Sequence, residues 1–170
     1  YGIPEYRLPS DVLEREIEHM RRSGFNIHLN TEVGRDIAFE QLKLDSDAVY
    51  VSTGTQLPQR MNIPGEDLEG VLPGIEYLKD VKLYHKVDFT GQTVAVVGGG
   101  NTAIDSARTA LRLGAKKVIV LYRRTRDAMP AYEIEVAEAL EEGVELIELV
   151  SPIKIHPDNY GRVSTIECVR

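Results

Sequence analysis

The sequence is poor in cysteine, in aromatic residues and in long apolar runs. Its single cysteine, Cys168, excludes a disulfide within these 170 residues and any zinc or iron–sulfur site built from their own cysteines. No apolar run reaches the roughly 20 residues that a membrane-spanning helix needs, and no signal peptide opens the chain. We therefore expect no membrane contact, no bound metal and a location in the reducing cytoplasm.

Basic residues are also too few for a nucleic-acid-binding protein. Lys and Arg number 20 against 27 Asp and Glu, which gives a formal net charge of −7. The arginine clusters Arg21-Arg22 and Arg123-Arg124 are only pairs, so binding to nucleic acid is not expected. The length allows one substantial core or parts of two domains. Because the chain begins at Tyr1 rather than Met and ends in an apparent strand, we expect a piece of a longer protein.

The most informative stretch joins an apolar run to a glycine turn. Val94–Val97 is typical of a buried parallel strand, and 104–113 repeats apolar residues at helical spacing. Between them Gly98, Gly100 and Ala103 form the pattern G-x-G-x-x-A. In that pattern the first glycine permits the sharp turn, the second lets a pyrophosphate approach the backbone, and the alanine allows close helix–strand packing. The pattern predicts a dinucleotide at the helix N-terminus; a tight turn without a ligand is the alternative.

The order of predicted elements places this turn in an α/β fold. From Thr93 to Val150 the order is βαβαβ, which is one mononucleotide-binding half of a doubly wound sheet. The N-terminal third is predicted to hold a helix that stops at Gly24 and two strands, 25–29 and 47–53, with 39–44 either a short helix or irregular. The other predicted elements are helices over 75–81 and 131–142, strands over 117–122 and 144–150, and a hairpin of 152–156 with 162–169.

The residues that follow the second strand of this unit indicate which dinucleotide binds. NAD-preferring sites place an acidic residue there, which accepts hydrogen bonds from the ribose 2′-hydroxyl. Here the strand runs into Arg123 and Arg124 instead. Two guanidinium groups suit a 2′-phosphate and do not replace a carboxylate. The sequence therefore favours NADP(H) over NAD(H); a solvated basic loop is the alternative.

Three stretches of the chain together resemble the glutamate synthase small-subunit family. They are residues 1–9 (YGIPEYRLP), 97–108 (VGGGNTAIDSAR) and 122–131 (YRRTRDAMPA). The resemblance extends over essentially the whole chain. The family includes the flavin-bearing part of dihydropyrimidine dehydrogenase. It implies a Rossmann-like NAD(P)-binding lobe of a flavoprotein with two dinucleotide-binding domains. In such a protein NADPH reduces FAD, and electron transfer continues to iron–sulfur clusters.

The resemblance also implies roles for individual residues. FAD would be contacted by Arg7, by the backbone of Val33 at the adenine, and by Thr53 and Gly54 beside the flavin nucleotide. The NADP pyrophosphate would be held by Gly99, Gly100, Asn101 and Thr102 within the 98–103 turn, and the 2′-phosphate by Arg123 and Arg124. Because the flavin carries the redox chemistry, we name no catalytic acid, base or nucleophile.

The expected domain organisation follows from the same resemblance. Residues 1–56 would be a remnant of the FAD-binding domain, 57–90 a connector, and 91–170 the NADP-binding domain. The FAD glycine fingerprint, the cysteine-rich cluster domain and the C-terminal flavin segment of the family have no counterpart here, so the FAD site is expected to be incomplete.

Partners would be NADPH and the rest of the parent flavoprotein, with its iron–sulfur domain or large subunit. Self-association into a homodimer could occur through apolar surface that a divided site exposes. A non-catalytic nucleotide-binding or regulatory module is the alternative function. Chemistry of the thioredoxin reductase type is excluded because it needs a C-x-x-C pair.

Overall fold

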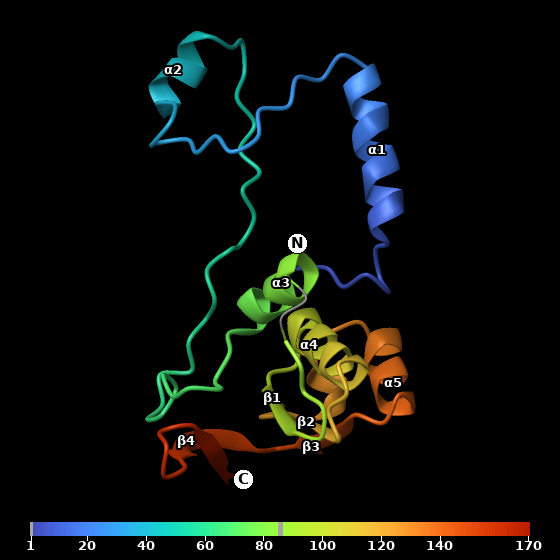
Figure 1. Ribbon diagram of the computed structural model, residues 1–170, viewed down its shortest axis with the longest axis vertical. Coiled ribbons are helices and arrows are strands. Elements are labelled where there is room, and N and C mark those ends of the chain that lie inside the picture. The colour runs from blue at the N-terminus through green and yellow to red at the C-terminus, as the bar shows by residue number, and fades with distance from the viewer. Residues whose placement is uncertain (1, 85–86) are drawn as a thin grey trace. The chain divides into compact units, whose positions relative to one another are not determined.

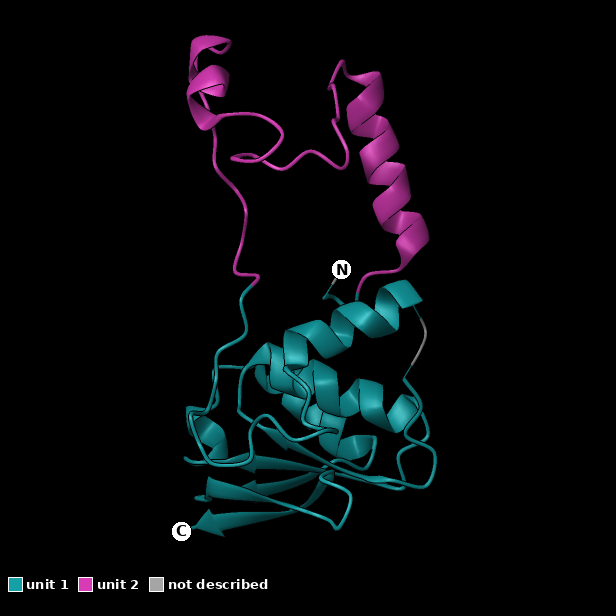
Figure 2. Ribbon diagram, turned by 60° about the vertical axis from the view of Figure 1, so that its left-hand side comes forward, with its two compact units in different colours: residues 1–7, 57–170 teal, residues 8–56 magenta. Residues whose placement is uncertain are grey.

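The computed structural model describes residues 2–84 and 87–170. Tyr1, in the first motif of the resemblance, and residues 85–86, in the expected connector, lie outside the described part. The chain divides into two compact units (Figure 2). Unit 1 comprises residues 1–7 and 57–170, and unit 2 comprises 8–56.

The centre of unit 1 is a parallel three-stranded sheet (Figure 1). Its strands β1 (Thr93–Val97), β2 (Lys117–Tyr122) and β3 (Glu145–Glu148) lie in the order β1-β2-β3. Helix α4 (Asn101–Arg112) connects β1 to β2, and α5 (Glu133–Glu141) connects β2 to β3. The predicted βαβαβ order is confirmed. Because Val97 pairs with Leu121, and Tyr122 with Glu148, the carboxyl ends of the three strands form one edge.

The core lies between this sheet and its helices. Helices α4 and α5 lie on the same face of the sheet, and α3 (Gly74–Tyr84) packs against α4 (Figure 2). Alanines in α4 and α5 allow the close approach of helix and strand. The core residues are Ile104, Ala107, Ala110, Val118, Val120, Ala131, Val136, Ala139 and Val144.

Strand β1 is buried on one face only, and the expectation of a fully buried strand is wrong. Thr93, Ala95 and Val97 are exposed, whereas Val94 and Val96 are partly buried against the core. Both crossover helices lie on the face that Val94 and Val96 occupy, because successive right-handed crossovers place their helices on the same side. Among the described residues no helix covers the opposite face of β1.

The end of the chain forms the predicted hairpin. Strands β4 (Ser151–Pro157) and β5 (Val163–Val169) pair antiparallel in a separate two-stranded sheet. The turn between them is held by Asp158, whose Oδ1 accepts hydrogen bonds from the backbone N–H groups of Tyr160 and Arg162 at 2.8 and 2.9 Å.

Unit 2 contains helices α1 (Ser10–Arg22) and α2 (Phe39–Leu44). Both predicted strands of this unit, 25–29 and 47–53, are wrong: the segments are not in strands, and Leu29 and Tyr50 are 69% and 92% exposed. An extended segment needs a neighbouring strand for its backbone hydrogen bonds, and within unit 2 the structure gives only an isolated bridge between Val33 and Ile37.

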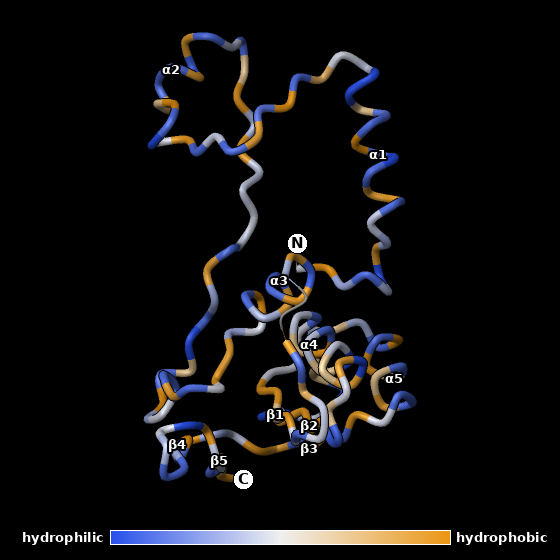
Figure 3. Tube along the Cα trace, in the orientation of Figure 1, coloured by the Kyte–Doolittle hydropathy of each residue, from blue (hydrophilic) through white to orange (hydrophobic). Residues whose placement is uncertain are grey.

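The apolar residues of unit 2 (Figure 3) therefore remain at the surface, and none of residues 8–56, all described, is buried. In the part of the chain that the structure describes, no helix has the length and apolar character needed to cross a bilayer.

Candidate nucleotide-binding site

The glycine turn begins where β1 ends. The N–H of Gly98 donates to the carbonyl oxygen of Leu121 at 3.1 Å, so the turn starts from the sheet edge. Gly98 has φ +134°, in the region that L side chains rarely adopt. A Cβ built at Gly98 would lie 3.4 Å from the Cβ of Ala103, so the alanine side chain already lies close to the turn. Gly98 therefore has a backbone conformation that suits glycine, and Ala103 is the side chain nearest to it.

Gly99 lies against the ring of Tyr122, a contact that the sequence pattern does not reveal. Gly99 is buried, and a Cβ built on it would lie within 2.8 Å of three ring atoms of Tyr122. The Tyr122 hydroxyl donates to the carbonyl oxygen of Ala128 at 2.7 Å, which holds the ring in place. Tyr122 thus supports the turn from the sheet side.

We expect Gly99→Ala to lower the free energy of unfolding by about 1–3 kcal/mol, the usual cost of overpacking. The added methyl group would force the Tyr122 ring to move and to give up its bond to Ala128. Gly100→Ala is the matched control, because a Cβ there meets nothing within 4 Å. Urea unfolding followed by circular dichroism measures both, and equal midpoints would contradict the packing argument.

The space beside Gly100 has the character of an anion site. Gly100 is the N-cap of α4, with φ −89° and ψ 172°, and no side chain caps this helix end. The first N–H groups of a helix lack intrahelical acceptors and carry the positive end of its dipole. The open space at Gly100 lets a phosphate reach them. The turn therefore fits the pyrophosphate of a dinucleotide.

The loop that follows β2 lies at the same edge of the sheet. Arg123 and Arg124 are exposed in it. The carbonyl oxygen of Arg124 accepts a hydrogen bond from the N–H of Leu149 at 3.3 Å, and the N–H of Arg126 donates to the carboxylate of Glu148. Because β1 and β2 are neighbours in register, both arginines emerge beside the glycine turn. The structure thus brings the two predicted parts of the NADP site together.

The same loop returns to the glycine turn before α5 begins. The N–H of Ala131 donates to the carbonyl oxygen of Gly99 at 3.0 Å. The next N–H, of Tyr132, donates to Oδ1 of Asn101 at 3.1 Å. The side chain of Asn101 therefore contacts the arginine-bearing loop, and Thr102, next to it, is exposed in the first turn of α4.

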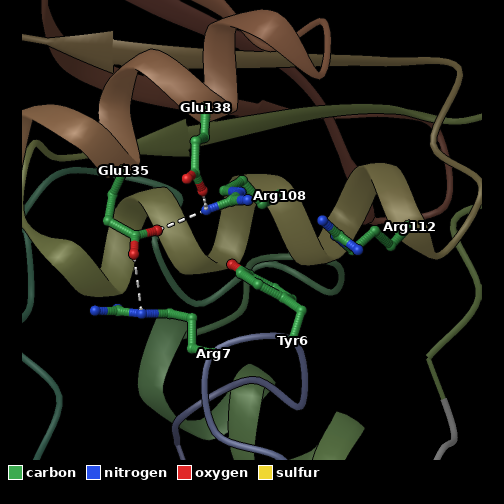
Figure 4. Close-up of a pocket in the computed structure, with 6 residues that line it drawn as sticks. All are labelled: Tyr6, Arg7, Arg108, Arg112, Glu135 and Glu138. Carbon is green, nitrogen blue, oxygen red and sulfur yellow. Dashed lines mark hydrogen bonds and ion pairs between the residues drawn. The ribbon is translucent and has the colours of Figure 1, made fainter.

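A second polar cluster of unit 1 includes Arg7 (Figure 4). Nη1 of Arg7 lies 2.8 Å from Oδ2 of Asp105, and its Nε lies 3.4 Å from Oε1 of Glu135. The Tyr6 hydroxyl donates to Oδ1 of Asp105 at 3.2 Å. These contacts hold the N-terminal segment against α4 and α5.

Arg108 is the centre of this cluster. Only 5% exposed, it pairs with Glu135, Glu138 and Glu142 at 2.6, 2.8 and 2.7 Å. Its guanidinium also lies 4.6 Å from the centroid of the Tyr6 ring, within the range of a cation–π contact.

Burial determines how several groups in the cluster titrate. It raises the pKa of Asp105 above its ordinary value, although the hydrogen bond from Arg7 opposes the rise. It also raises the pKa of Tyr6, and the Asp105 charge adds to that effect. For Glu142 burial would raise the pKa, but hydrogen bonds from Arg108 and Arg112 lower it overall. Three arginines thus face four carboxylates in this cluster, and their ion pairs tie the N-terminal segment, α4 and α5 together.

The residues assigned to FAD occupy both units. Arg7 belongs to unit 1, in the ion pairs just described, while Val33, Thr53 and Gly54 belong to unit 2. Val33 is 51% exposed, Gly54 has φ +69°, and the carbonyl oxygen of Thr53 accepts a hydrogen bond from Gln56 at 3.3 Å. Their assignment to a flavin site stays a prediction.

Comparison with known proteins shows which family this chain matches and which proteins are similar to it. The sequence model of the family described as pyridine nucleotide-disulphide oxidoreductase matches residues 13–160. The β subunit of NADP(+)-dependent formate dehydrogenase from Moorella thermoacetica is 46% identical over 171 residues, which cover 99% of this chain and 24% of that protein. The glutamate synthase [NADPH] small chain of Escherichia coli is 38% identical over 180 residues, covering 100% of this chain and 38% of that one.

A solved structure confirms the fold. The His57Gln mutant of FprA from Mycobacterium tuberculosis superposes with a TM-score of 0.81 at 19% identity, over 99% of this chain and 53% of that one. The chain thus spans between 24% and 38% of the length of the two relatives named above. The expected α/β architecture of a dinucleotide-binding flavoprotein and the resemblance to the glutamate synthase small subunit are both confirmed.

Proposed function

Since this chain belongs to the pyridine nucleotide-disulphide oxidoreductase family, we propose that unit 1 binds NADPH and presents it for hydride transfer to FAD within a larger flavoprotein. One observation carries the proposal. The uncapped N-terminus of α4 faces open space at Gly100, and two exposed arginines stand at the same sheet edge. This arrangement suits a ligand that carries a pyrophosphate and a third phosphate on the same ribose.

The pyrophosphate would lie on the glycine turn. Backbone N–H groups of Gly99, Gly100, Asn101 and Thr102 are the donors that we assign to it. Gly98 and Ala103 shape the turn without contacting the ligand. The dipole of α4 adds to the attraction without placing a full positive charge beside the phosphates.

The 2′-phosphate would be bound by Arg123 and Arg124. Both follow β2 directly, where an NAD-binding site would carry an acidic residue. Planar guanidinium groups bind phosphate through two parallel hydrogen bonds. The two relatives described above are also named for NADP(+) or NADPH.

This chain supplies binding and orientation rather than acid–base chemistry. When bound, NADPH provides the hydride and FAD accepts it. We propose that residues 1–56 belong to the FAD-binding part, with Arg7, Val33, Thr53 and Gly54 toward the flavin nucleotide, and that 91–170 form the NADP-binding domain after a connector at 57–90. In the parent protein, electrons would continue to an iron–sulfur domain or a large subunit, as in a glutamate synthase. We propose that this parent protein is located in the cytoplasm.

Calorimetric titration of the chain with NADPH and NADH tests the nucleotide assignment. We expect NADPH to bind more tightly, and Arg123→Ala to weaken it by about 1.5–3 kcal/mol, the range for hydrogen bonds to charged groups. Affinity for NADH should hardly change, because NADH lacks the 2′-phosphate. Arg21→Ala, in the exposed arginine pair of unit 2, is the control and should alter neither affinity.

Equal affinities for the two nucleotides in the unaltered chain would refute the assignment to NADP. Flavin reduction by NADPH in the parent protein would support the enzyme function. Nucleotide binding without any reduction there would instead favour a regulatory module.

A further inference from the structure

The side chain of Asn101 connects the two halves of the proposed site. Its Oδ1 accepts a hydrogen bond from the backbone N–H of Tyr132 at 3.1 Å. The preceding N–H, of Ala131, donates to the carbonyl oxygen of Gly99 at 3.0 Å. Two successive amides of the loop after β2 are therefore bonded to the glycine turn, one of them through a side chain.

The loop so anchored is the one that carries the arginines. At its start the carbonyl oxygen of Arg124 accepts from the N–H of Leu149, and in its middle the carbonyl oxygen of Ala128 accepts from the Tyr122 hydroxyl. These contacts join the loop to the ends of β2 and β3. The bond between Asn101 and Tyr132 is a side-chain contact that joins this loop to the start of α4.

We propose that Asn101 is a positioning residue that sets the preference for NADPH over NADH. This proposal rests on the proposed function and deepens it. The backbone N–H of Asn101 remains assigned to the pyrophosphate, whereas its side chain fixes the distance from the glycine turn to Arg123 and Arg124. The amide oxygen suits this role because it accepts a backbone N–H and brings no negative charge to the phosphates.

The physical reason is preorganisation. NADPH carries its pyrophosphate and its 2′-phosphate on the same ribose, which limits how far apart they can lie, so the two protein sites must be suitably spaced at the same time. Guanidinium groups bind phosphate well only in a suitable orientation. A loop that first has to be ordered by the ligand binds it less tightly. Loss of the contact to Asn101 should therefore weaken the 2′-phosphate contacts selectively.

The test compares the ratio of the two dissociation constants, Kd(NADH) over Kd(NADPH), in the 170-residue chain and its variants. Asn101→Ala should weaken NADPH binding about three- to tenfold, as expected for one hydrogen bond, and NADH binding less than twofold. Asn101→Asp keeps the acceptor oxygen, so it should leave residues 123–132 as protected from hydrogen exchange as in the unaltered chain, although its charge weakens both ligands and NADPH the more. Asn159→Ala, in the exposed hairpin turn, is the matched control.

A double-mutant cycle separates positioning from direct contact. With Arg123 and Arg124 already replaced by alanine, Asn101→Ala should cause no further loss of NADPH affinity. An additive loss, or an equal loss for NADPH and NADH in the single variant, would overturn the proposal. If the unaltered chain prefers neither nucleotide, the proposed function itself fails, and the positioning role falls with it.

Hydrogen exchange in the ligand-free chain provides a readout that needs no nucleotide. Amides of residues 123–132 should exchange faster in Asn101→Ala than in the unaltered chain or in Asn159→Ala. Amides of β2 should keep their protection. Unchanged exchange over 123–132 would show that Asn101 does not restrain the loop and would overturn the proposal.

Discussion

Replacing Gly100 with valine is expected to abolish binding of NADPH and NADH while unit 1 stays folded. The valine side chain would occupy the open space through which a phosphate reaches the first N–H groups of α4. Hydrogen bonds to charged groups contribute about 1.5–3 kcal/mol each. The loss of two such bonds weakens binding by about a hundredfold or more, which removes measurable affinity for a nucleotide bound in the micromolar range.

The fold should tolerate this change for a local reason. Gly100 has φ −89° and ψ 172°, which valine adopts readily, and a Cβ there meets nothing within 4 Å. Valine is a poor N-cap, at a cost of about 0.5–1 kcal/mol. Its smaller conformational freedom in the unfolded chain offsets about 0.4–1 kcal/mol. The urea midpoint should therefore hardly move.

Gly100→Ala completes the series, because a single methyl group should weaken both nucleotides less than valine does. Calorimetry gives the affinities, and circular dichroism verifies that each variant is folded. A folded Gly100→Val chain that binds NADPH with unchanged affinity would show that the ligand lies elsewhere than on this turn.

The parts of the fold that the sequence predicts are those fixed by local patterns. A glycine turn between an apolar run and a helical repeat specifies β1, α4 and their connection, and the right-handed crossover rule then leaves little choice for β2 and β3. The exposed face of β1 cannot be predicted in the same way, because a four-residue apolar run does not indicate which of its faces a helix will cover. The predicted strands 25–29 and 47–53 are absent from the structure, because strand formation depends on a partner from elsewhere in the chain.

The site shows the same division between local and distant information. Gly98 to Ala103 and the two arginines are short contiguous patterns, so their proximity follows from the sheet topology. The bond from Tyr132 to Asn101 joins residues 31 positions apart, and that from Arg7 to Asp105 spans 98. The residue types of the two partners do not predict such hydrogen bonds. They become evident only when tertiary packing has placed α4 beside its neighbours.

Arg108→Ala is expected to cause the largest loss of stability, about 2–4 kcal/mol in the free energy of unfolding. Breaking a fully buried ion pair costs about 3–5 kcal/mol, and partial exposure of Glu138 and Glu142 reduces that figure. The alanine would leave three carboxylates near one another without their common cation. It would also remove the guanidinium that lies over the Tyr6 ring.

The loss should depend on pH in a defined direction. In the folded chain the pKa of Glu142 is lowered from its ordinary 4.5, with burial opposing and bonds from Arg108 and Arg112 producing the shift. A lowered carboxyl pKa stabilises the fold above the unfolded pKa, and that contribution disappears as pH falls through the folded value. The difference between Arg108→Ala and the unaltered chain should therefore be complete at pH 7 and shrink below pH 4.5.

Arg112→Ala provides the matched comparison for this prediction. Arg112 also pairs with Glu142, at 2.7 Å, and stacks on Tyr6, but its side chain is 48% exposed. Exposed ion pairs contribute about 0–1 kcal/mol, so this variant should lose far less stability. Urea unfolding of both variants at pH 7 and pH 4, followed by circular dichroism, gives the four differences. Equal losses for the two arginines at pH 7 would show that burial of Arg108 does not govern the strength of the cluster.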